Sequence, residues 1–474
     1  MQPLKIFVAI ANYGTGNDKY LGSVIEEYRA MRSFAVDIAV VSNVRKSLSP
    51  GIELIVVNLQ GRDPWSLPFE HKALLAGKVH NYDLFIYSED DMLITERNIR
   101  AFIEVSTRLA CEEIAGFFRF EQCPGKERNY PDVHQHFHWD PESIHTTPCG
   151  DVIAHFTNEH AGCYILTQSQ LRRCLNSGRF IVEPHRGKYG LPETAATDPY
   201  TQCGFRKMIC VSRFDDFLVH HLPNKYMGSQ FGVSDKELRR QLSCLVDLAR
   251  RGRHPAPLLN TESKLKLAMF SKNYYEPASE EVLSLVPAGA GNVLSLGCGW
   301  GATEAKLSER ASVTAVPLDS IIPGGLPKGV EIVTGDLAGV LEALSGRKYD
   351  CVLLPSILHL VPKPVELLSC VRKLLSSGGT LVINSPNMRS LPITWRSWKD
   401  LKAPSQLDFT GSGVHRISPH ELQRWLAASG MRSERMVHLK SPRVAGVCSA
   451  TFGLFDPLFS TDFLTAARVA PERN

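Results

Sequence analysis

Short apolar runs alternate with helix-patterned segments along most of this chain. Near the start, residues 6–11 are all apolar, and residues 20–33 then place apolar side chains at the spacing of one helix face. Two more largely apolar runs follow at 36–41 and 52–57. This succession predicts a βαβ opening, in which the loop at 12–18 follows the first strand at the edge where open α/β sheets bind ligands.

The alternation returns in the second half, beginning with the apolar run at 292–296. This run leads into three glycines at alternate positions within 297–301, and a helix pattern follows. Glycine lets a backbone turn sharply and lets a ligand lie against main-chain N–H groups. Later apolar runs at 312–316, 330–336 and 349–360 continue the βαβ spacing, so a second, doubly wound α/β sheet is predicted.

Two α/β patterns of this size predict two domains. Between them, a helical pattern at 230–250 ends in the basic, proline-bearing run at 250–257. Such a run is typical of an exposed linker, and contact of its arginines with anionic lipid phosphates is the alternative. We therefore expect a first domain over residues 1–250, a linker over 251–272, and a second domain with a C-terminal extension over 273–474.

Composition narrows the class of protein. The 474-residue chain is 43% hydrophobic and 22% charged, and its net charge of +4 is too mild to predict nucleic-acid binding. Its 12 cysteines include no CxxC pair, so neither a zinc module nor a disulfide scaffold is expected. No window reaches about 18 uninterrupted apolar residues, so no transmembrane segment is expected. We expect a cytoplasmic enzyme, with peripheral contact at the inner face of the cytoplasmic membrane left open.

Three consecutive acids, Glu89, Asp90 and Asp91, follow the strand predicted at 84–87. Like charges packed at a strand end are costly unless a cation lies there. Carboxylate oxygens suit Mg²⁺ or Mn²⁺, so a divalent cation carrying a diphosphate is the expected occupant. The alternative is a solvated turn that caps the helix predicted from about residue 96.

Residues 4 to about 230 resemble GT-A nucleotide-sugar glycosyltransferases, in which a D-x-D motif occupies such a strand end. In this comparison Glu89 and Asp91 hold the two acidic positions, and Asp91 is the expected metal contact. The resemblance implies a Rossmann-like mixed sheet and a nucleotide-sugar donor held with Mn²⁺ or Mg²⁺. The residues expected to bind the nucleotide-sugar are Asn12, Glu89, Asp90 and Lys225.

Two later segments extend this resemblance. The run at 219–225 resembles the terminal histidine segment that completes the family's metal shell, and the run at 193–198 offers carboxylates for the catalytic base of inverting members. The expected metal ligands are Glu89, Asp91, His220 and His221. The expected bases are Glu193 and, after it, Asp198. The alternative interpretation makes these acids loop residues and the histidines surface or core residues.

A histidine-rich segment lies between these motifs, with His134, His136 and His138 alternating in it. Alternating histidines can bind a transition metal. The segment is also turn-rich and contains prolines, and residues that alternate on a loop need not converge. We favour a lid that contacts the acceptor.

Residues from about 273 to 440 resemble class I S-adenosylmethionine (SAM) methyltransferases of the UbiG/MetW-like group. The resemblance rests on the glycine loop, the aspartate-led run at 349–355, the Leu-His-Leu turn at 358–360 and the Gly-Gly-Thr-Leu-Val run at 378–382. It implies SAM as the cofactor. The expected cofactor-binding residues are Ser295, Gly297, Gly299, Gly301, Asp319 and Asp336.

Two positions depart from that family's pattern. Ser295 stands where the first strand often carries an acid, and Pro317 stands where an acid is expected to bind the ribose, with Asp319 two residues later. Methyl transfer needs the acceptor oxygen aligned and its proton removed. His359, after the fourth predicted strand, and His415, on a late loop, are the expected bases, and a structural turn residue is the alternative for His359.

Together the resemblances imply a bifunctional enzyme of cell-surface polysaccharide assembly. It would transfer a sugar from a nucleotide-sugar to a glycan or lipid-linked glycan, and methylate a glycan hydroxyl with SAM. One alternative is a methyltransferase of a small metabolite or glycan whose first half binds a nucleotide or glycan without catalysis. Another is a scaffolding or glycan-binding protein in which one or both domains are inactive.

Overall fold

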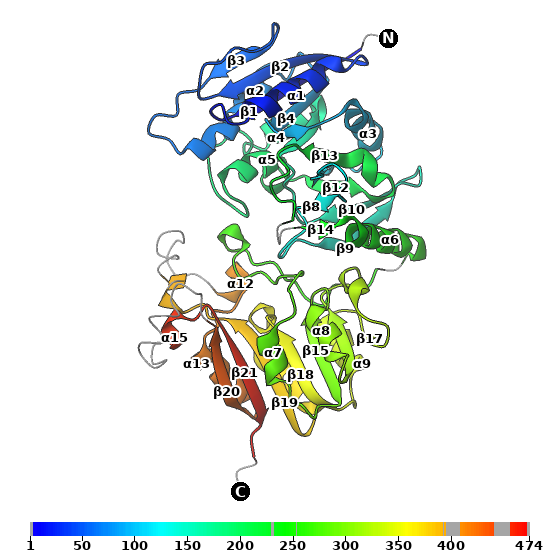
Figure 1. Ribbon diagram of the computed structural model, residues 1–474, viewed down its shortest axis with the longest axis vertical. Helices are drawn as coiled ribbons and strands as arrows, with labels where there is room; N and C mark the ends of the chain where they lie inside the picture. Colours follow the sequence, from blue (N-terminus) through cyan, green and yellow to red (C-terminus); the bar gives the residue numbers. More distant parts are fainter. Residues whose placement is uncertain are drawn as a thin grey trace. The chain divides into compact units, whose positions relative to one another are not determined.

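The computed structural model describes residues 3–228, 232–252, 254–391, 393–394, 408–439 and 456–471. The chain divides into two compact units, Met1–His254 and Pro255–Asn474 (Figure 1). Each unit has its own hydrophobic core. Arg253 of the predicted basic linker and residues 440–455 of the predicted C-terminal extension lie outside the described residues. No helix in the described part of the chain is long and apolar enough to cross a membrane.

The first unit is built on a five-stranded sheet in the order β11-β4-β1-β2-β3. Its strands are β1 (Leu4–Asn12), β2 (Phe34–Ser42), β3 (Glu53–Val56), β4 (Leu84–Glu89) and β11 (Cys163–Thr167), and α1 (Asp18–Ala30) joins β1 to β2. The first four strands are parallel, and β11 runs antiparallel to β4. The predicted βαβ opening is therefore confirmed. The register pairs Ala11 with Glu89, so polar residues that follow β1 and β4 come together at one edge.

Smaller sheets complete the first unit. One has the order β6-β12-β10-β9, a second β5-β13-β7, and a third pairs β14 with β8. These strands are β5 (Met92–Leu93), β6 (Glu113–Ala115), β7 (Phe118–Phe120), β8 (Asn129–Tyr130), β9 (Trp139–Thr146), β10 (Val152–Phe156), β12 (Arg206–Cys210), β13 (Leu218–His221) and β14 (Val233–Ser234). The accompanying helices are η1 (Pro64–Glu70), α2 (His71–Lys78), α3 (Glu96–Ser106), α4 (Gln168–Asn176), α5 (Leu191–Thr201), η2 (Val211–Phe217) and α6 (Asp235–Arg251). The antiparallel pairing of β13 with β5 sets His221 opposite Met92, the residue after the acids.

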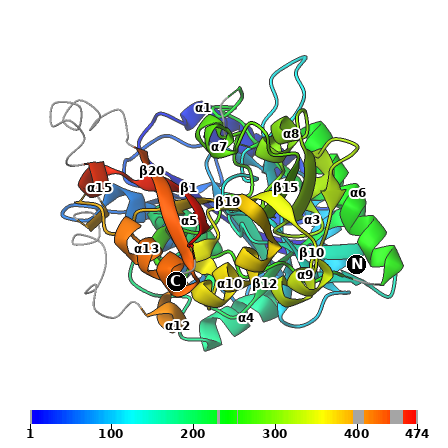
Figure 2. The same ribbon diagram turned by 90° about the horizontal axis from the view of Figure 1, so that it is seen from below.

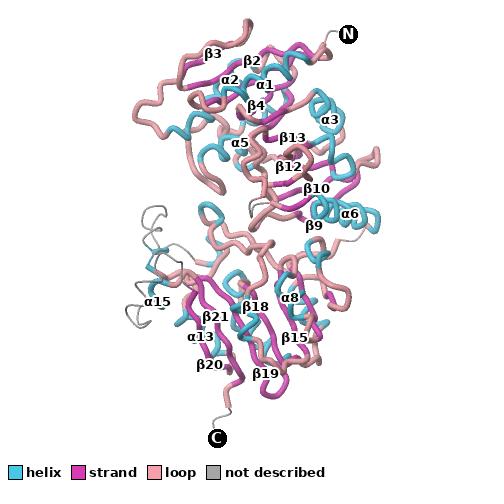
Figure 3. Tube along the Cα trace, in the orientation of Figure 1, coloured by secondary structure: helices cyan, strands magenta, loops and turns pink. Residues whose placement is uncertain are grey.

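The second unit is one seven-stranded sheet in the order β17-β16-β15-β18-β19-β21-β20 (Figure 3). Its strands are β15 (Asn292–Cys298), β16 (Ser312–Pro317), β17 (Glu331–Ile332), β18 (Tyr349–Pro355), β19 (Leu375–Pro386), β20 (Met431–Leu439) and β21 (Asp462–Val469). β21 runs antiparallel to both of its neighbours, β19 and β20, and the other neighbouring pairs of this sheet are parallel. The strand order reverses between β15 and β18, and open α/β sheets bind ligands outside the carboxyl ends of strands at such a switch point.

Helices cover both faces of this sheet, as the doubly wound prediction requires. Figure 2 shows α7 and α8 on one face, and α9, α10 and α13 on the other. These helices are α7 (Glu280–Leu285), α8 (Ala302–Leu307), α9 (Leu337–Ala343), α10 (Pro364–Leu374) and α13 (Pro419–Ala428), and the short helices η3 (Lys266–Ala268), η4 (Ile322–Gly325), η5 (Leu358–Leu360), α12 (Phe409–Ser412) and α15 (Asp456–Phe459) lie between the larger elements.

The segment 255–272 packs in the second unit, although its composition predicted an exposed linker. Leu258 and Leu265 are buried in that unit's core. The Leu258 N–H also donates to the Leu318 carbonyl at 2.8 Å. Burial of its apolar residues therefore keeps this segment in the second unit, despite its prolines and charges. The boundary between the two units follows His254 directly.

We expect residues 1–254 and 255–474, produced separately, to be soluble and to unfold cooperatively, because each unit buries its own core. Thermal unfolding followed by circular dichroism checks this, with the full chain as the reference. An insoluble fragment, or one that melts without a transition, contradicts independent folding.

Candidate functional site

In the first unit, Asp90 lies beside the end of β1. The Asn12 side-chain amide donates to Asp90 Oδ2 at 2.6 Å, and the Asn17 amide donates to Asp90 Oδ1 at 2.8 Å. Burial and the adjacent Asp91 raise the pKa of Asp90 to about 6, although the two amides oppose the rise. The structure therefore brings the predicted pair Asn12 and Asp90 into direct contact.

His221 lies against the other side of Asp91. Its Nε2 is 3.5 Å from Asp91 Oδ2, and its Nδ1 is 2.6 Å from Glu121 Oε1. Burial lowers the pKa of His221, but the hydrogen bonds to Asp91 and Glu121 outweigh it and hold this pKa above its ordinary value. Asp91 Oδ1 is buried and has no hydrogen-bond partner among the described residues. Asp91 thus keeps one oxygen for a ligand.

Glu89 ends β4 within the same group of charges. Burial first, and then Asp91, raise its pKa to about 8, while Arg119 of β7 opposes the rise. Arg119 is itself held by Asp132 at 2.6 Å. A Cβ at Gly162, whose φ is +65°, would lie 3.3 Å from Glu89 Oε2, so the glycine lets the loop before β11 approach the acids closely.

The structure does not bring His220 to the acids. Its ring stacks on Phe120 with centroids 4.8 Å apart, and its Nε2 lies 3.1 Å from Asn224 Oδ1. Successive residues of a strand point to opposite faces, so only one histidine of the pair can face Asp91. Lys225 is exposed, with its Nζ 4.8 Å from the Tyr226 ring centre.

The two predicted bases on α5 differ in surroundings. Asp198 is fully buried and forms an ion pair with Lys72 of α2, and His185 Nε2 lies 3.4 Å from its Oδ1. Asp198 therefore holds α5 against α2 and is not exposed to an acceptor. Glu193, in the first turn of α5, is half-buried and raises the pKa of Glu89, which places it within electrostatic reach of the acids.

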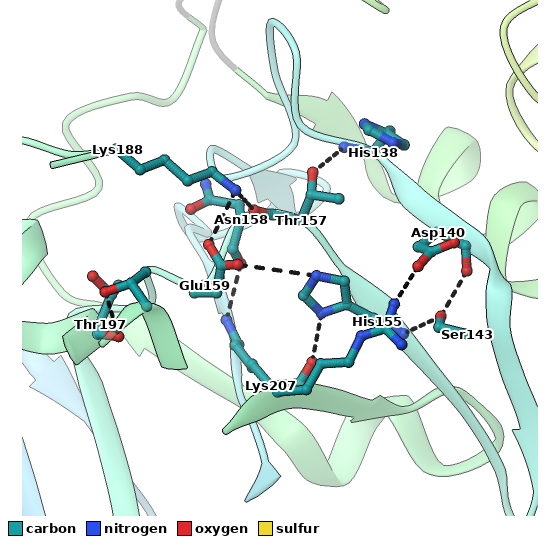
Figure 4. A network of polar contacts seen from close by, with 12 residues as sticks. His138, Asp140, Ser143, His155, Thr157, Asn158, Glu159, Lys188, Thr197 and Lys207 are labelled. Atoms are coloured by element: carbon teal, nitrogen blue, oxygen red, sulfur yellow. Dashed lines mark hydrogen bonds and ion pairs between the residues drawn. The ribbon is translucent and has the colours of Figure 1, made fainter. Parts of the chain in front are cut away.

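A buried polar network in this unit was not predicted from the sequence (Figure 4). Glu159, in the loop between β10 and β11, lies 3.2 Å from Lys188 Nζ and accepts from the Tyr189 hydroxyl at 2.5 Å. Lys207 Nζ donates to the Asn158 carbonyl at 3.2 Å, and burial lowers the pKa of Lys207 to about 8. The network fixes the loop that leads to Gly162. Isolated loop charges carry no motif, so no sequence signal could have found it.

The histidine-rich segment does not form a metal site in the part of the chain that the structure describes. No group of three or more His, Cys, Asp or Glu side chains there is arranged to hold an ion, at this segment or at the acids. Burial lowers the pKa of His136 to about 3 and that of His134 in the same direction. His155 Nδ1 lies 2.8 Å from the Lys207 carbonyl, so this ring supports the loop.

In the second unit, the glycine loop after β15 contacts the turn after β18. Gly297 has a φ of +90°, and a Cβ there would lie 2.6 Å from Ile357 Cγ2. Gly301 also has a φ of +90°, and a Cβ there would lie 2.1 Å from Leu326 Cδ2. Both positions therefore require glycine, for backbone conformation and for space.

The space beside Gly299 is filled by the backbone of the protein itself. A Cβ at Gly299 would lie 2.2 Å from the Tyr274 carbonyl oxygen, which also accepts from the Trp300 N–H at 2.9 Å. The sequence predicted that this glycine makes room for a ligand. In the structure, the backbone of Tyr274 occupies that room.

The other predicted cofactor residues have local partners. Ser295 is fully buried, and its hydroxyl donates to Glu304 Oε1 at 2.6 Å. Asp319 is buried, and its Oδ1 accepts from the N–H groups two and three residues further on, at 2.7 and 2.8 Å. Asp336 is exposed and caps α9. The predicted contacts of Asp319 and Asp336 with the cofactor therefore stay proposals.

His359 and His415 lie side by side, since the His415 N–H donates to the His359 carbonyl at 2.8 Å. His359 Nε2 donates to the Phe270 carbonyl at 2.8 Å, and its buried Nδ1 has no partner among the described residues. Burial lowers the pKa of His359 to about 4, so the ring is neutral and Nδ1 can accept a proton. His415 Nε2 lies 3.0 Å from the Val361 carbonyl, and its ring stacks on Phe409.

Residues 269–434 match the family described as methyltransferase domain. The match lies within the second unit and supports a methyltransferase domain there, with SAM as its methyl donor. The match begins after the first unit ends, so the glycosyltransferase expectation for that unit stays a proposal.

Individual proteins also resemble part of this chain. The "Bifunctional methionine biosynthesis protein MetXA/MetW" of Rhodopirellula baltica is 28% identical over an alignment of 147 positions that covers 27% of this chain. The chain spans only 22% of that relative's length. A SAM-dependent methyltransferase from Archaeoglobus fulgidus covers 38% of this chain and 86% of its own, with 20% identity and a TM-score of 0.30. A second one, from Mesorhizobium loti, covers 40% of this chain and 95% of its own, with 19% identity and a TM-score of 0.29.

We expect Gly299→Ala to destabilise the second unit by about 1–3 kcal/mol, because the new Cβ must displace the Tyr274 backbone. Gly289→Ala is the matched control, since a Cβ at this exposed position has no described atom within 4 Å, and its effect should stay within about 0.5 kcal/mol. Urea unfolding of both variants measures the difference. Equal stabilities would show that the segment around Tyr274 does not depend on Gly299.

Proposed function

We propose that this chain is a bifunctional transferase of cell-surface polysaccharide assembly. The methyltransferase domain methylates a glycan hydroxyl with SAM, and the first unit transfers a sugar from a nucleotide-sugar to a glycan or lipid-linked glycan. Joining the two activities in one chain raises the effective concentration of one site's product at the other. The support differs between the units, so each is argued separately.

For the methyltransferase domain, the supporting observation is the contact between the glycine loop and the turn that carries His359, at the switch point of the sheet. SAM supplies a methyl group already activated by its sulfonium. The loop around Gly297 and Gly301 holds the cofactor, and Asp319 and Asp336 contact its ribose and adenine. His359 Nδ1 accepts the proton of the acceptor hydroxyl, with His415 beside it on the acceptor side.

We expect His359→Gln to lower kcat for methyl transfer about a hundredfold or more, because glutamine keeps a donor for the Phe270 carbonyl but has no basic nitrogen. Transfer of tritium from labelled SAM to a cell-surface glycan extract measures the rate. His359→Ala should also lower Tm, since it leaves the Phe270 carbonyl without its donor. A Gln variant as active as the parent would make His359 purely structural.

The pKa of His359 predicts how the rate of methyl transfer depends on pH. Burial lowers the pKa of His359 to about 4, so the proton-accepting form is fully present from about pH 6 to pH 8. His359 should therefore contribute no loss of rate as the pH falls through this range. A rate in the parent that falls tenfold between pH 8 and pH 6, and is flat in His359→Gln, would contradict the lowered pKa.

For the first unit, the supporting observation is the buried, unpartnered Oδ1 of Asp91 next to His221. Mg²⁺ and Mn²⁺ need few protein ligands when a substrate supplies phosphate oxygens, so Asp91 with His221 or Glu89 fits such an ion without a third close donor. Lys225 is exposed and free to meet the diphosphate, and Glu193 is the better placed of the two bases. Asn12 and Asp90 then contact the nucleoside.

We expect Asp91→Asn to abolish the increase in Tm that nucleotide-sugars produce with Mn²⁺, because the amide loses the charge that an ion requires. A panel of UDP-, GDP- and dTDP-sugars tested by thermal shift, with and without Mn²⁺, also identifies the donor. Asp247→Asn, which removes an exposed carboxylate on α6, is the control and should behave as the parent. A shift that survives in Asp91→Asn places the donor elsewhere.

One observation favours a second candidate. Within the described residues no three donors form a complete metal site. A methyltransferase of a small metabolite or glycan, with a first unit that binds a nucleotide or glycan without catalysis, accommodates this fact. Binding of nucleotide-sugars that is unaffected by Mn²⁺ or by Asp91→Asn would select this alternative.

A further inference from the structure

Glu304 is a buried carboxylate next to the glycine loop. It lies in α8, three residues after Gly301, and is only 3% exposed. Its Oε1 accepts from the hydroxyl of Ser295, which lies in β15 two residues before the loop begins. The two side chains therefore join the strand that enters the loop to the helix that leaves it.

This carboxylate has no cationic partner in the described part of the chain. The charged form of a buried acid is costly unless a cation or several donors stabilise it, and Ser295 supplies one neutral donor. Lys272 lowers the pKa of Glu304 electrostatically, but its ammonium forms an ion pair with Glu276. Burial accordingly raises the pKa of Glu304. A bound cation would therefore stabilise the charged form of this carboxylate.

The position of Glu304 indicates which kind of cation its carboxylate would bind. The carboxylate borders the loop at the switch point, where the proposed cofactor binds. SAM carries two cationic groups, a sulfonium and the α-ammonium of its methionine portion. Only the ammonium has N–H donors, which form the stronger, charge-assisted hydrogen bonds with a carboxylate.

We propose that Glu304 binds the α-ammonium group of SAM and that Ser295 orients the Glu304 carboxylate, an inference that rests on the proposed methyltransferase function. Glu304 then supplies, from the helix after the loop, the negative charge that Ser295 lacks. Ser295 is a positioning residue for this contact.

Calorimetric titration of the full chain with two SAM-related ligands tests the proposal. S-Adenosylhomocysteine keeps the ammonium group, whereas 5′-methylthioadenosine lacks the whole amino-acid portion. Glu304→Gln should weaken S-adenosylhomocysteine binding at least tenfold, equivalent to about 1.4 kcal/mol, and change methylthioadenosine binding less than twofold. Glu309→Gln, which removes an exposed carboxylate just after α8, should bind both ligands as the parent does.

Ligand-free stability separates binding from a structural role. Because Glu304 is a buried acid without an ion-pair partner among the described residues, Glu304→Gln should leave the Tm of the ligand-free protein unchanged or raise it. Loss of both ligands in equal measure, unchanged binding of S-adenosylhomocysteine, or a clear fall in the ligand-free Tm would each overturn the proposal. A parent chain that binds neither ligand overturns the SAM-binding function itself, whereas a parent that binds both leaves that function standing whatever the variant shows.

Discussion

The parallel register between β1 and β4 determines where buried charge collects in the first unit. It sets Ala11 opposite Glu89, so Asn12 and the acids that follow β4 must share one edge of the sheet. Burying several carboxylates together is costly, and the structure reduces that cost with neutral amide donors and His221. The compensation is incomplete at Asp91, whose Oδ1 has no partner among the described residues. An incompletely compensated, buried acid is the physical basis for proposing a cation at this edge.

The carboxyl ends of the strands in the second unit are arranged differently. There the edge is lined by backbone, because Gly297, Gly299 and Gly301 each lie too close to a neighbour to carry a side chain. Beside the loop, Glu304 supplies negative charge, and the Ser295 hydroxyl fixes its carboxylate. The first unit thus gathers several acids at one point, as a divalent ion carrying phosphates requires. The second unit offers a close backbone and separate carboxylates, with Glu304 proposed for the ammonium and Asp319 and Asp336 for the nucleoside.

Local sequence patterns predicted the helices and strands, but they did not predict contacts between residues that lie far apart in the sequence. The strands β1, β4, β15 and β18 and the glycine loop were predicted because apolar runs and glycines depend on backbone and burial alone. The ion pair of Asp198 with Lys72 joins residues 126 positions apart, so the sequence showed only a carboxylate in a run resembling a catalytic one. The arginines and prolines likewise suggested a linker over 251–272, whereas Leu258 and Leu265 of that segment pack into the core.

The pair His220 and His221 shows why the sequence alone does not predict which residues face the site. A sequence can place both residues on a strand, and alternation then guarantees that they face opposite ways. The phase of that alternation is fixed only by the pairing of β13 with β5, which sets His221 beside the residue after Asp91 and turns His220 toward Phe120. Ser295 is a similar case. It stands where an acid was expected in the first strand of the second unit, and a residue of α8, Glu304, accepts a hydrogen bond from its hydroxyl. The composition of a site can therefore be preserved while the residue that supplies each group changes, and only the packed structure shows which residue supplies it.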